Sequence, residues 1–238
     1  MKKWIKGGGF ALAVVGLLFI IQYQFVSNDS WSTWQLPLSG KVIVLDPGHG
    51  GPDGGAVSKE GLLEKDVTLS IALELRDYLQ EAGALVLMTR EEDSDLADKD
   101  IKKIRQRKVQ DLKRRVELIN GSNGDMFVSI HLNAIPSPRW KGAQTFYNRT
   151  IEENEYIAKF VQDEIRRNLE NTHRVAKPIG NVYLIKQAKT PGVLVEVGFL
   201  SNPEEAELLE KEKYQQKVAA SIYQGILRYY AEEPVPAS

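Results

Sequence analysis

Histidine is scarce in this chain, and one of its three copies stands in a glycine-rich segment that follows an apolar run. The segment, residues 42–56, reads VIVLDPGHGGPDGGA. Glycine-rich loops after strands often cradle phosphate, but the dinucleotide pattern requires a third glycine where Asp53 stands, and the P-loop sequence G-K-[ST] is absent. A carboxylate in such a cradle would also repel phosphate. The loop therefore predicts a site built on His49 and Asp53 rather than a nucleotide site.

A second histidine, His131, closes another apolar run, DMFVSIH. If both runs are neighbouring strands, the two imidazoles lie at one sheet edge, and two histidines so placed favour metal binding. A catalytic zinc site needs a third protein ligand and an open position. Glu64 is one candidate, although a glutamate at a helix start could equally serve only the helix dipole. His173, in the polar stretch NTHR, is predicted to lie on the surface. The competing ligands are Asp46, Asp53 and Glu60.

A glutamate, Glu196, interrupts the apolar run GVLVEVGFL. A carboxylate inside an apolar strand costs several kcal/mol unless it is paired, hydrogen-bonded or close to a cation. A salt bridge to an arginine such as Arg115, or an edge strand with a wet outer face, would each account for it. The functional interpretation is a general base and acid beside a metal, which takes a proton from water and delivers it to a leaving amine.

The strands and helices around these candidate site residues determine where their side chains lie. From Lys41 onward, apolar β-branched runs alternate with helical patterns, which predicts a single α/β domain with a mostly parallel central sheet flanked by helices. Ligands gather at the carboxyl ends of strands in such sheets, so the two histidines fall at the functional edge. Asn202 or Ser201 before Pro203 predicts a helix start. The predicted strands are 42–46, 84–89, 126–131, 143–147 and 193–199, and the predicted helices are 65–81, 101–119, 154–169 and 213–230.

The bulk composition excludes several classes of function. The chain has 238 residues, 42% of them hydrophobic and 26% charged, which suffices for a real core. Its formal net charge of -1 gives no reason to expect a nucleic-acid partner. It has no cysteine, which excludes thiolate nucleophiles, cysteine metal ligands and disulfides.

The N-terminus differs from the rest of the chain. Three lysines precede an apolar run from Phe10 to Val26, which predicts a signal or membrane anchor over residues 1–28. The run is at the short limit of the roughly 17–25 residues that span a membrane, but no small-x-small cleavage site follows, which favours an uncleaved anchor. Residues 29–40 are then a tether, 41–232 the catalytic domain and 233–238 a tail. The catalytic domain is expected outside the cytoplasm.

Four segments together resemble a known family. LDPGHGGPDGGA, Glu64 in EKD, SIHLNA and LVEVGFLSNPEE are similar in content and order to the zinc-dependent N-acetylmuramoyl-L-alanine amidases of the amidase_3 type, from about Lys41 to Tyr230. The resemblance implies that His49, Glu64 and His131 bind zinc and that Glu196 is catalytic. It also implies the substrate, peptidoglycan, cut at the amide between N-acetylmuramic acid and L-alanine.

The chain departs from this family in one segment, residues 94–111, whose charged sequence is either a solvated helical face or a docking surface for a partner or an anionic wall polymer. It carries no wall-binding repeats, so its compact form resembles the sporulation-type amidases that modify cortex peptidoglycan. A membrane-associated or wall-associated protein partner is a further expectation. The alternatives are a zinc carboxypeptidase-like peptidase acting on wall peptides and a non-catalytic wall-binding module.

Overall fold

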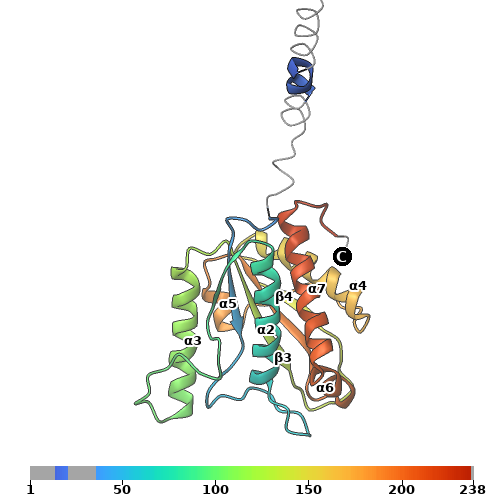
Figure 1. Cartoon of the computed structure of the whole chain (residues 1–238). Coiled ribbons are helices and arrows are strands. Elements are labelled where there is room, and N and C mark those ends of the chain that lie inside the picture. The colour runs from blue at the N-terminus through green and yellow to red at the C-terminus, as the bar shows by residue number, and fades with distance from the viewer. Residues whose placement is uncertain (1–13, 21–35, 237–238) are drawn as a thin grey trace, which may run out of the picture. The chain divides into compact units, whose positions relative to one another are not determined.

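The computed structural model describes residues 14–20 and 36–236 of the chain (Figure 1). Residues 14–20 are helical, and the rest of the predicted anchor and most of the tether lie outside the described residues. In these two described ranges, no helix is both long and apolar enough to cross a membrane. Residues from Pro37 onward form one compact unit, which contains the whole predicted catalytic domain.

The described part of this unit is built around one six-stranded sheet with the order β2-β1-β3-β6-β4-β5. The first four strands in that order run parallel, whereas β4 pairs antiparallel with β6. The sheet is therefore mostly parallel, as predicted, but the one antiparallel pairing makes it mixed. Residues 134–143, which join β3 to β4, contain no helix, and a parallel return needs a crossover of about a dozen residues or more. The strands are β1 (Val42–Pro47), β2 (Leu85–Met88), β3 (Met126–Asn133), β4 (Gln144–Tyr147), β5 (Lys177–Pro178) and β6 (Gly192–Phe199).

Helices cover both faces of the sheet (Figure 1). Ile43 and Leu45 of β1 pack in the larger core with α2, α4 and α7, while Val44 between them packs on the other face with α3 and α5. This alternation follows from the two-residue period of a strand, and it makes a helix–sheet–helix sandwich. The helices are α2 (Glu64–Glu81), α3 (Ile104–Gly121), α4 (Glu153–Leu169), α5 (Tyr183–Gln187), α6 (Pro203–Leu209) and α7 (Glu212–Tyr230).

The predicted elements are confirmed with small shifts at their ends. The helix predicted from residue 101 begins at Ile104, because Lys103 before it has an extended backbone conformation. The predicted start of α6 is confirmed: Asn202 is the N-cap, its side chain accepts the Glu205 N–H at 3.1 Å, and Pro203 follows. The short elements β5 and α5 were not predicted, because a few residues carry too little periodicity to be recognised.

The closest helix packing in the larger core depends on Gly225 of α7. A Cβ atom there would lie 2.6 Å from the Val161 Cα atom and 3.0 Å from the Phe160 carbonyl oxygen, both on α4. We expect Gly225→Ala to lower the free energy of unfolding by about 1–3 kcal/mol, the usual cost of overpacking. Gly121→Ala is the matched control, because nothing lies within 4 Å of its Cβ position. Urea unfolding of both variants measures the difference, and equal stability would contradict the packing.

Candidate metal centre and active site

His49 is held in an unusual backbone conformation directly after β1. Its φ of 62° lies in the left-handed region that few residues other than glycine adopt. The neighbouring Gly48 donates its N–H to the Ile130 carbonyl of β3 at 2.9 Å. A Cβ atom on Gly48 would lie 2.4 Å from the His131 ring. The glycine loop therefore serves to bring the two histidines together, and their ring centroids are 5.1 Å apart.

Glu64, the first residue of α2, lies between the two imidazoles. Its Oε2 is 3.1 Å from His49 Nε2, and its Oε1 is 2.9 Å from His131 Nδ1. The same carboxylate accepts the N–H groups of Ala56 at 2.8 Å and Leu132 at 2.9 Å. A glutamate that only complemented the helix dipole would be exposed to solvent, but Glu64 is buried. The structure therefore brings together all three side chains that the sequence nominated as metal ligands.

The donor set fits a zinc ion. One potential ligand atom from each of His49, Glu64 and His131 lies within 4.8 Å of the other two. Two imidazoles and a carboxylate form an established ligand set for catalytic zinc, which leaves a fourth position open. A cavity of about 220 Å³ adjoins the cluster, and both histidines and Glu196 line it. The described residues thus supply three ligands and free space where a substrate could enter.

The electrostatics of the cluster keep its carboxylate ionised. Burial alone would raise the pKa of Glu64, but hydrogen bonds and charge interactions with His131 and His49 hold it far below its usual range. Burial alone would lower the pKa of His49, but hydrogen bonds with Asp53 and Glu64 outweigh the effect of burial and raise this pKa to about 9. An ionised carboxylate is the form that binds a metal ion, and a metal ion bound to His49 would displace the proton that its raised pKa retains.

The three competing ligand candidates, Asp46, Asp53 and Glu60, lie outside the three-residue cluster. Asp53 contacts the other side of the His49 ring, with its Oδ2 2.8 Å from Nδ1. A carboxylate in that position orients a metal-binding imidazole. Asp46 is buried in an ion pair with Arg115 at 2.8 Å, and Glu60 is exposed and outside the cluster.

Two residues of the charged segment 94–111, Lys108 and Asp111, line the cavity beside the cluster. Lys108 of α3 places its Nζ 3.0 Å from Asp53 Oδ2, so it holds this carboxylate in place, and Asp111 pairs with Arg115 at 2.8 Å. The sequence indicated only that the segment is charged, because the packing of α3 against the loop is what brings Lys108 near Asp53.

Two arginines hold the backbone of the loop. Arg115 donates to the carbonyls of Pro47 at 2.8 Å and His49 at 2.6 Å. Arg90 donates to the carbonyls of Pro47 at 3.1 Å and Gly48 at 3.0 Å. Burial alone would lower the pKa of Arg115, but its interactions with Asp46 and Asp111 outweigh the effect of burial and raise this pKa. Neither arginine was predicted to have this function.

Glu196 lies beside the cluster on the central strand β6. It pairs in register with His131 of β3 and with Gln144 of β4, so it is not on an edge strand. Arg115 is occupied by Asp46 and Asp111 and does not form an ion pair with it. Both structural explanations of this glutamate are therefore wrong.

The side chain of Glu196 is partly buried, and its carboxylate is incompletely satisfied. Among the described residues, its Oε2 is buried without a hydrogen-bond partner. Burial raises its pKa to about 7, partly opposed by His131 and reinforced by the negative charge of Glu64. A carboxylate with a strongly perturbed pKa beside a metal site is typical of a proton-transfer residue.

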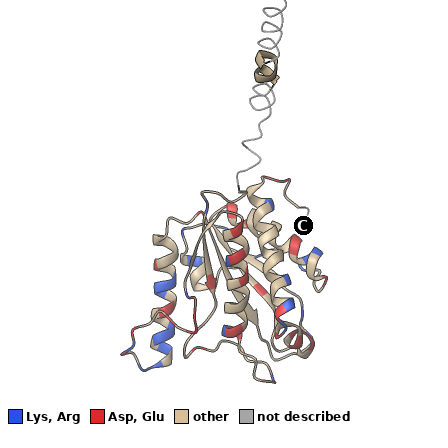
Figure 2. Cartoon of the chain, viewed as in Figure 1, with Lys and Arg blue, Asp and Glu red and all other residues tan. Residues whose placement is uncertain are grey.

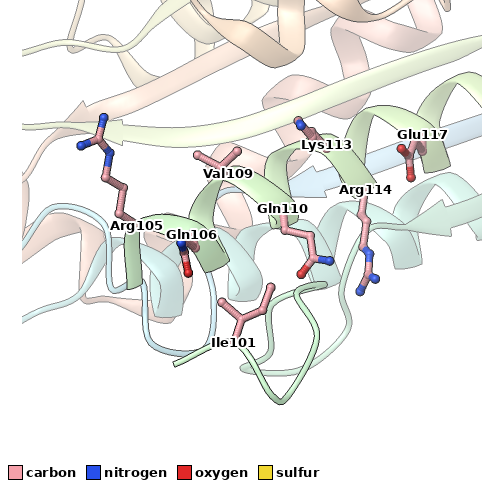
Figure 3. A pocket seen from close by; sticks show the side chains of 8 residues that line it. All are labelled: Ile101, Arg105, Gln106, Val109, Gln110, Lys113, Arg114 and Glu117. Atoms are coloured by element: carbon pink, nitrogen blue, oxygen red, sulfur yellow. The ribbon is translucent and has the colours of Figure 1, made fainter. Parts of the chain in front are cut away.

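The described surface has three relevant hollows, and the largest is remote from this chemistry. It measures about 770 Å³ and follows the outer side of α3, where Ile101 from the preceding loop and side chains of the helix line it (Figure 3). Basic residues concentrate along this helix (Figure 2), but the hollow contains no histidine. The other two, of about 220 and 210 Å³, share Glu196 as a lining residue. Both smaller cavities therefore border Glu196.

An α/β domain with two histidines and a glutamate at its strand ends, and a buried glutamate beside them, is typical of a metal-dependent hydrolase. The family model for N-acetylmuramoyl-L-alanine amidase matches residues 43–228, and the chain belongs to this family. The chain is also 60% identical over 236 residues to the germination-specific N-acetylmuramoyl-L-alanine amidase of Bacillus subtilis (strain 168), covering 99% of each chain. It is 34% identical over 196 residues to the amidase LytC of the same organism, covering 82% of this chain and 36% of LytC.

Solved structures agree with this assignment. The CwlD amidase from Clostridioides difficile, solved in complex with the GerS lipoprotein, matches with a TM-score of 0.79 and 44% identity, covering 81% of this chain and 99% of that one. The amidase AmiC2 of Nostoc punctiforme matches with a TM-score of 0.68 and 30% identity, covering 82% and 99%. The family expected from the sequence is thus confirmed.

The buried pair of Asp46 and Arg115 gives a stability prediction. We expect Arg115→Leu to lower the free energy of unfolding by about 3–5 kcal/mol, because it leaves Asp46 buried without its countercharge. Arg114→Leu is the neighbouring control, since Arg114 pairs with a half-exposed Asp98 and its loss should cost much less. Denaturant unfolding of both variants tests this, and comparable losses would contradict a special role of Arg115.

Proposed function

We propose that this chain is a zinc-dependent hydrolase that cuts the amide between N-acetylmuramic acid and L-alanine in peptidoglycan, outside the cytoplasm. The observation that carries the proposal is the Oε2 atom of Glu196, which is buried without a hydrogen-bond partner among the described residues, on a strand position in register with His131 of the three-residue cluster. Membership of the N-acetylmuramoyl-L-alanine amidase family supports the bond that is cut. The predicted anchor over residues 1–28 would keep the catalytic domain near the membrane surface.

In this proposal His49, Glu64 and His131 hold the zinc ion, and Asp53 keeps the His49 ring in position. Bound zinc supplies Lewis acidity, which polarises the scissile carbonyl and makes water acidic near neutral pH. Glu196 accepts a proton from the attacking water as the water oxygen bonds to the carbonyl carbon. It then donates this proton to the alanine nitrogen as the C–N bond breaks. A pKa of about 7 suits both steps.

The alternative functions have less support. A closed structural zinc site would need a fourth protein ligand, but the cluster among the described residues has three members. A wall-binding module would also have no use for a buried carboxylate beside the metal, which costs stability. A carboxypeptidase-like activity would cut a different amide, and the family match supports the muramoyl bond instead.

We extend the proposal to the peptidoglycan of spores. The support is the 60% identity, over 99% of both chains, to an amidase described as germination-specific. The chain should release L-alanine amines faster from spore peptidoglycan than from vegetative peptidoglycan of the same Bacillus strain. Equal rates would remove this part of the proposal and leave the amidase activity intact.

A protein partner is also part of the proposal, because the related CwlD amidase is solved in complex with a lipoprotein. A membrane-associated partner would suit a catalytic domain that is itself held at the membrane by its N-terminal segment.

Glu196→Gln tests the proton-transfer role. The amide keeps the shape of the side chain but cannot accept the proton, so kcat should fall by about 10²–10⁴-fold while zinc binding remains. New N-terminal alanine from digested peptidoglycan measures the rate, and metal analysis measures the zinc. Glu60→Gln is the matched control, because Glu60 is exposed and outside the cluster. Unchanged activity in Glu196→Gln would refute the mechanism.

The histidines test the metal assignment. His131→Ala should reduce bound zinc from near one per chain to a small fraction and abolish activity, because one of three ligands is lost. His173→Ala should change neither, since His173 is an exposed residue outside the cluster. Zinc retained by His131→Ala would show that the ligand set is wrong.

Zinc should also stabilise the fold, since it binds the folded state. At a free concentration 100 times its Kd, the gain is about 2.7 kcal/mol. Removal with a chelator should therefore lower the Tm, and added zinc should restore it. A Tm that does not respond to zinc would indicate that the cluster is not a metal site.

A further inference from the structure

The second cavity beside Glu196 holds an arginine that the proposed mechanism does not use. We propose that Arg174 is a specificity-determining residue that binds a carboxylate of the peptide released with L-alanine. This inference rests on the proposed function and adds to it the side of the site that receives the peptide.

The sheet places Arg174 on the same line as the reactive groups. Glu196 of β6 is in register with His131 on one side and with Gln144 of the antiparallel β4 on the other. Residues directly opposite each other in a sheet point to the same face. The line therefore runs from the metal ligand to the proton-transfer residue and on to Gln144, across two strand spacings of about 4.8 Å each.

Arg174 continues this line. Its Nη1 atom donates a hydrogen bond to Gln144 Oε1 at 3.2 Å. Arg174 also lines the cavity of about 210 Å³ together with Gln144 and Glu196. An extended peptide advances about 3.3 Å per residue. A short peptide that begins at the scissile amide can therefore reach from Glu196 to Arg174.

Neighbouring side chains hold Arg174 in a defined position. The guanidinium carbon lies 5.6 Å from the ring centre of Trp140 and 5.3 Å from that of Phe199, so the group is held between two aromatic side chains. Its backbone carbonyl accepts a hydrogen bond of 3.1 Å from the buried side chain of Gln162. A preorganised guanidinium loses less conformational entropy when it binds a ligand.

Arg174 has no carboxylate partner among the described residues. Its side-chain hydrogen bonds go to the carbonyl of Lys141 and the amide of Gln144, which are neutral acceptors. The nearby Glu205 uses its oxygens for the N–H groups of Gly142 and Phe199. The two cations that line the other cavity are already paired, Lys108 with Asp53 and Arg115 with Asp46 and Asp111. An anionic group entering the site therefore finds a cation free of an acidic partner in the Arg174 cavity.

The chemistry of the substrate decides which half enters there. The carboxyl group of N-acetylmuramic acid is consumed in the scissile amide, so this half carries no negative charge. The peptide that begins with L-alanine must end in a carboxylate. Arg–carboxylate pairs form strong, charge-assisted hydrogen bonds. The cavity with Arg174 is accordingly the peptide side, and the cavity with His49 and Lys108 is left for the sugar.

The test compares two N-acetylmuramoyl tripeptides that begin with L-alanine, one with free carboxylates and one with all of them converted to carboxamides. The zinc-loaded 238-residue chain should cleave the carboxylate form with a kcat/KM higher by about tenfold or more, mainly through KM. In Arg174→Gln this ratio should fall to near one, and Arg174→Lys should restore part of it. Arg139→Gln, which removes an exposed cation from the neighbouring loop, should keep the ratio.

Two results would overturn the inference. One is a wild-type enzyme whose kcat/KM values for the two substrates are nearly equal. This result would leave the amidase activity itself unaffected. The other is an Arg174→Gln variant that loses activity on both substrates equally and keeps the ratio, which would assign Arg174 a purely structural role. Failure of the wild type to cleave either tripeptide at the muramoyl bond, and peptidoglycan as well, would instead contradict the proposed function.

Discussion

The buried ion pair between Asp46 and Arg115 is the interaction on which the site depends. It lies under the carboxyl end of β1, where Arg115 also binds the carbonyls of Pro47 and His49. Those carbonyls belong to a loop whose φ at His49 is 62°. A non-glycine residue in that region persists only when its surroundings determine it. The ion pair therefore helps to fix the backbone at His49 and so the direction of its side chain.

A second constraint is the opposite treatment of two glutamates at one site. Glu64 receives two backbone N–H groups and two imidazoles, so its pKa stays low and it remains ionised. Among the described residues, Glu196 has a buried oxygen without a hydrogen-bond partner, and burial raises its pKa to about 7. The two residues have the same side chain and lie in the same site. Their different hydrogen bonds and charged neighbours separate their pKa values, which is the general way in which one residue type serves two roles.

The sequence predicted the parts of this arrangement that depend on local pattern. Apolar runs identified the strands that end near His49 and His131, and an isolated charge identified Glu196. Glu64 stayed undecided without the family resemblance, because its contacts with His131 and Leu132 join segments far apart in the chain. Lys108 was recognised only as part of the charged segment 94–111, and Arg174 was not singled out, since ordinary surface cations look the same in a sequence. Their roles arise only from packing between distant elements.

The antiparallel pairing of β4 with β6, which the sequence did not predict, also shapes the second half of the site. The short connection over residues 134–143 brings Trp140 to the second cavity and leaves Gln144 beside Glu196. A parallel return would have taken the chain through a helix of about a dozen residues or more. The change in strand direction is thus what lets one buried glutamate face two cavities, as an enzyme that cuts between two unlike halves of a substrate requires.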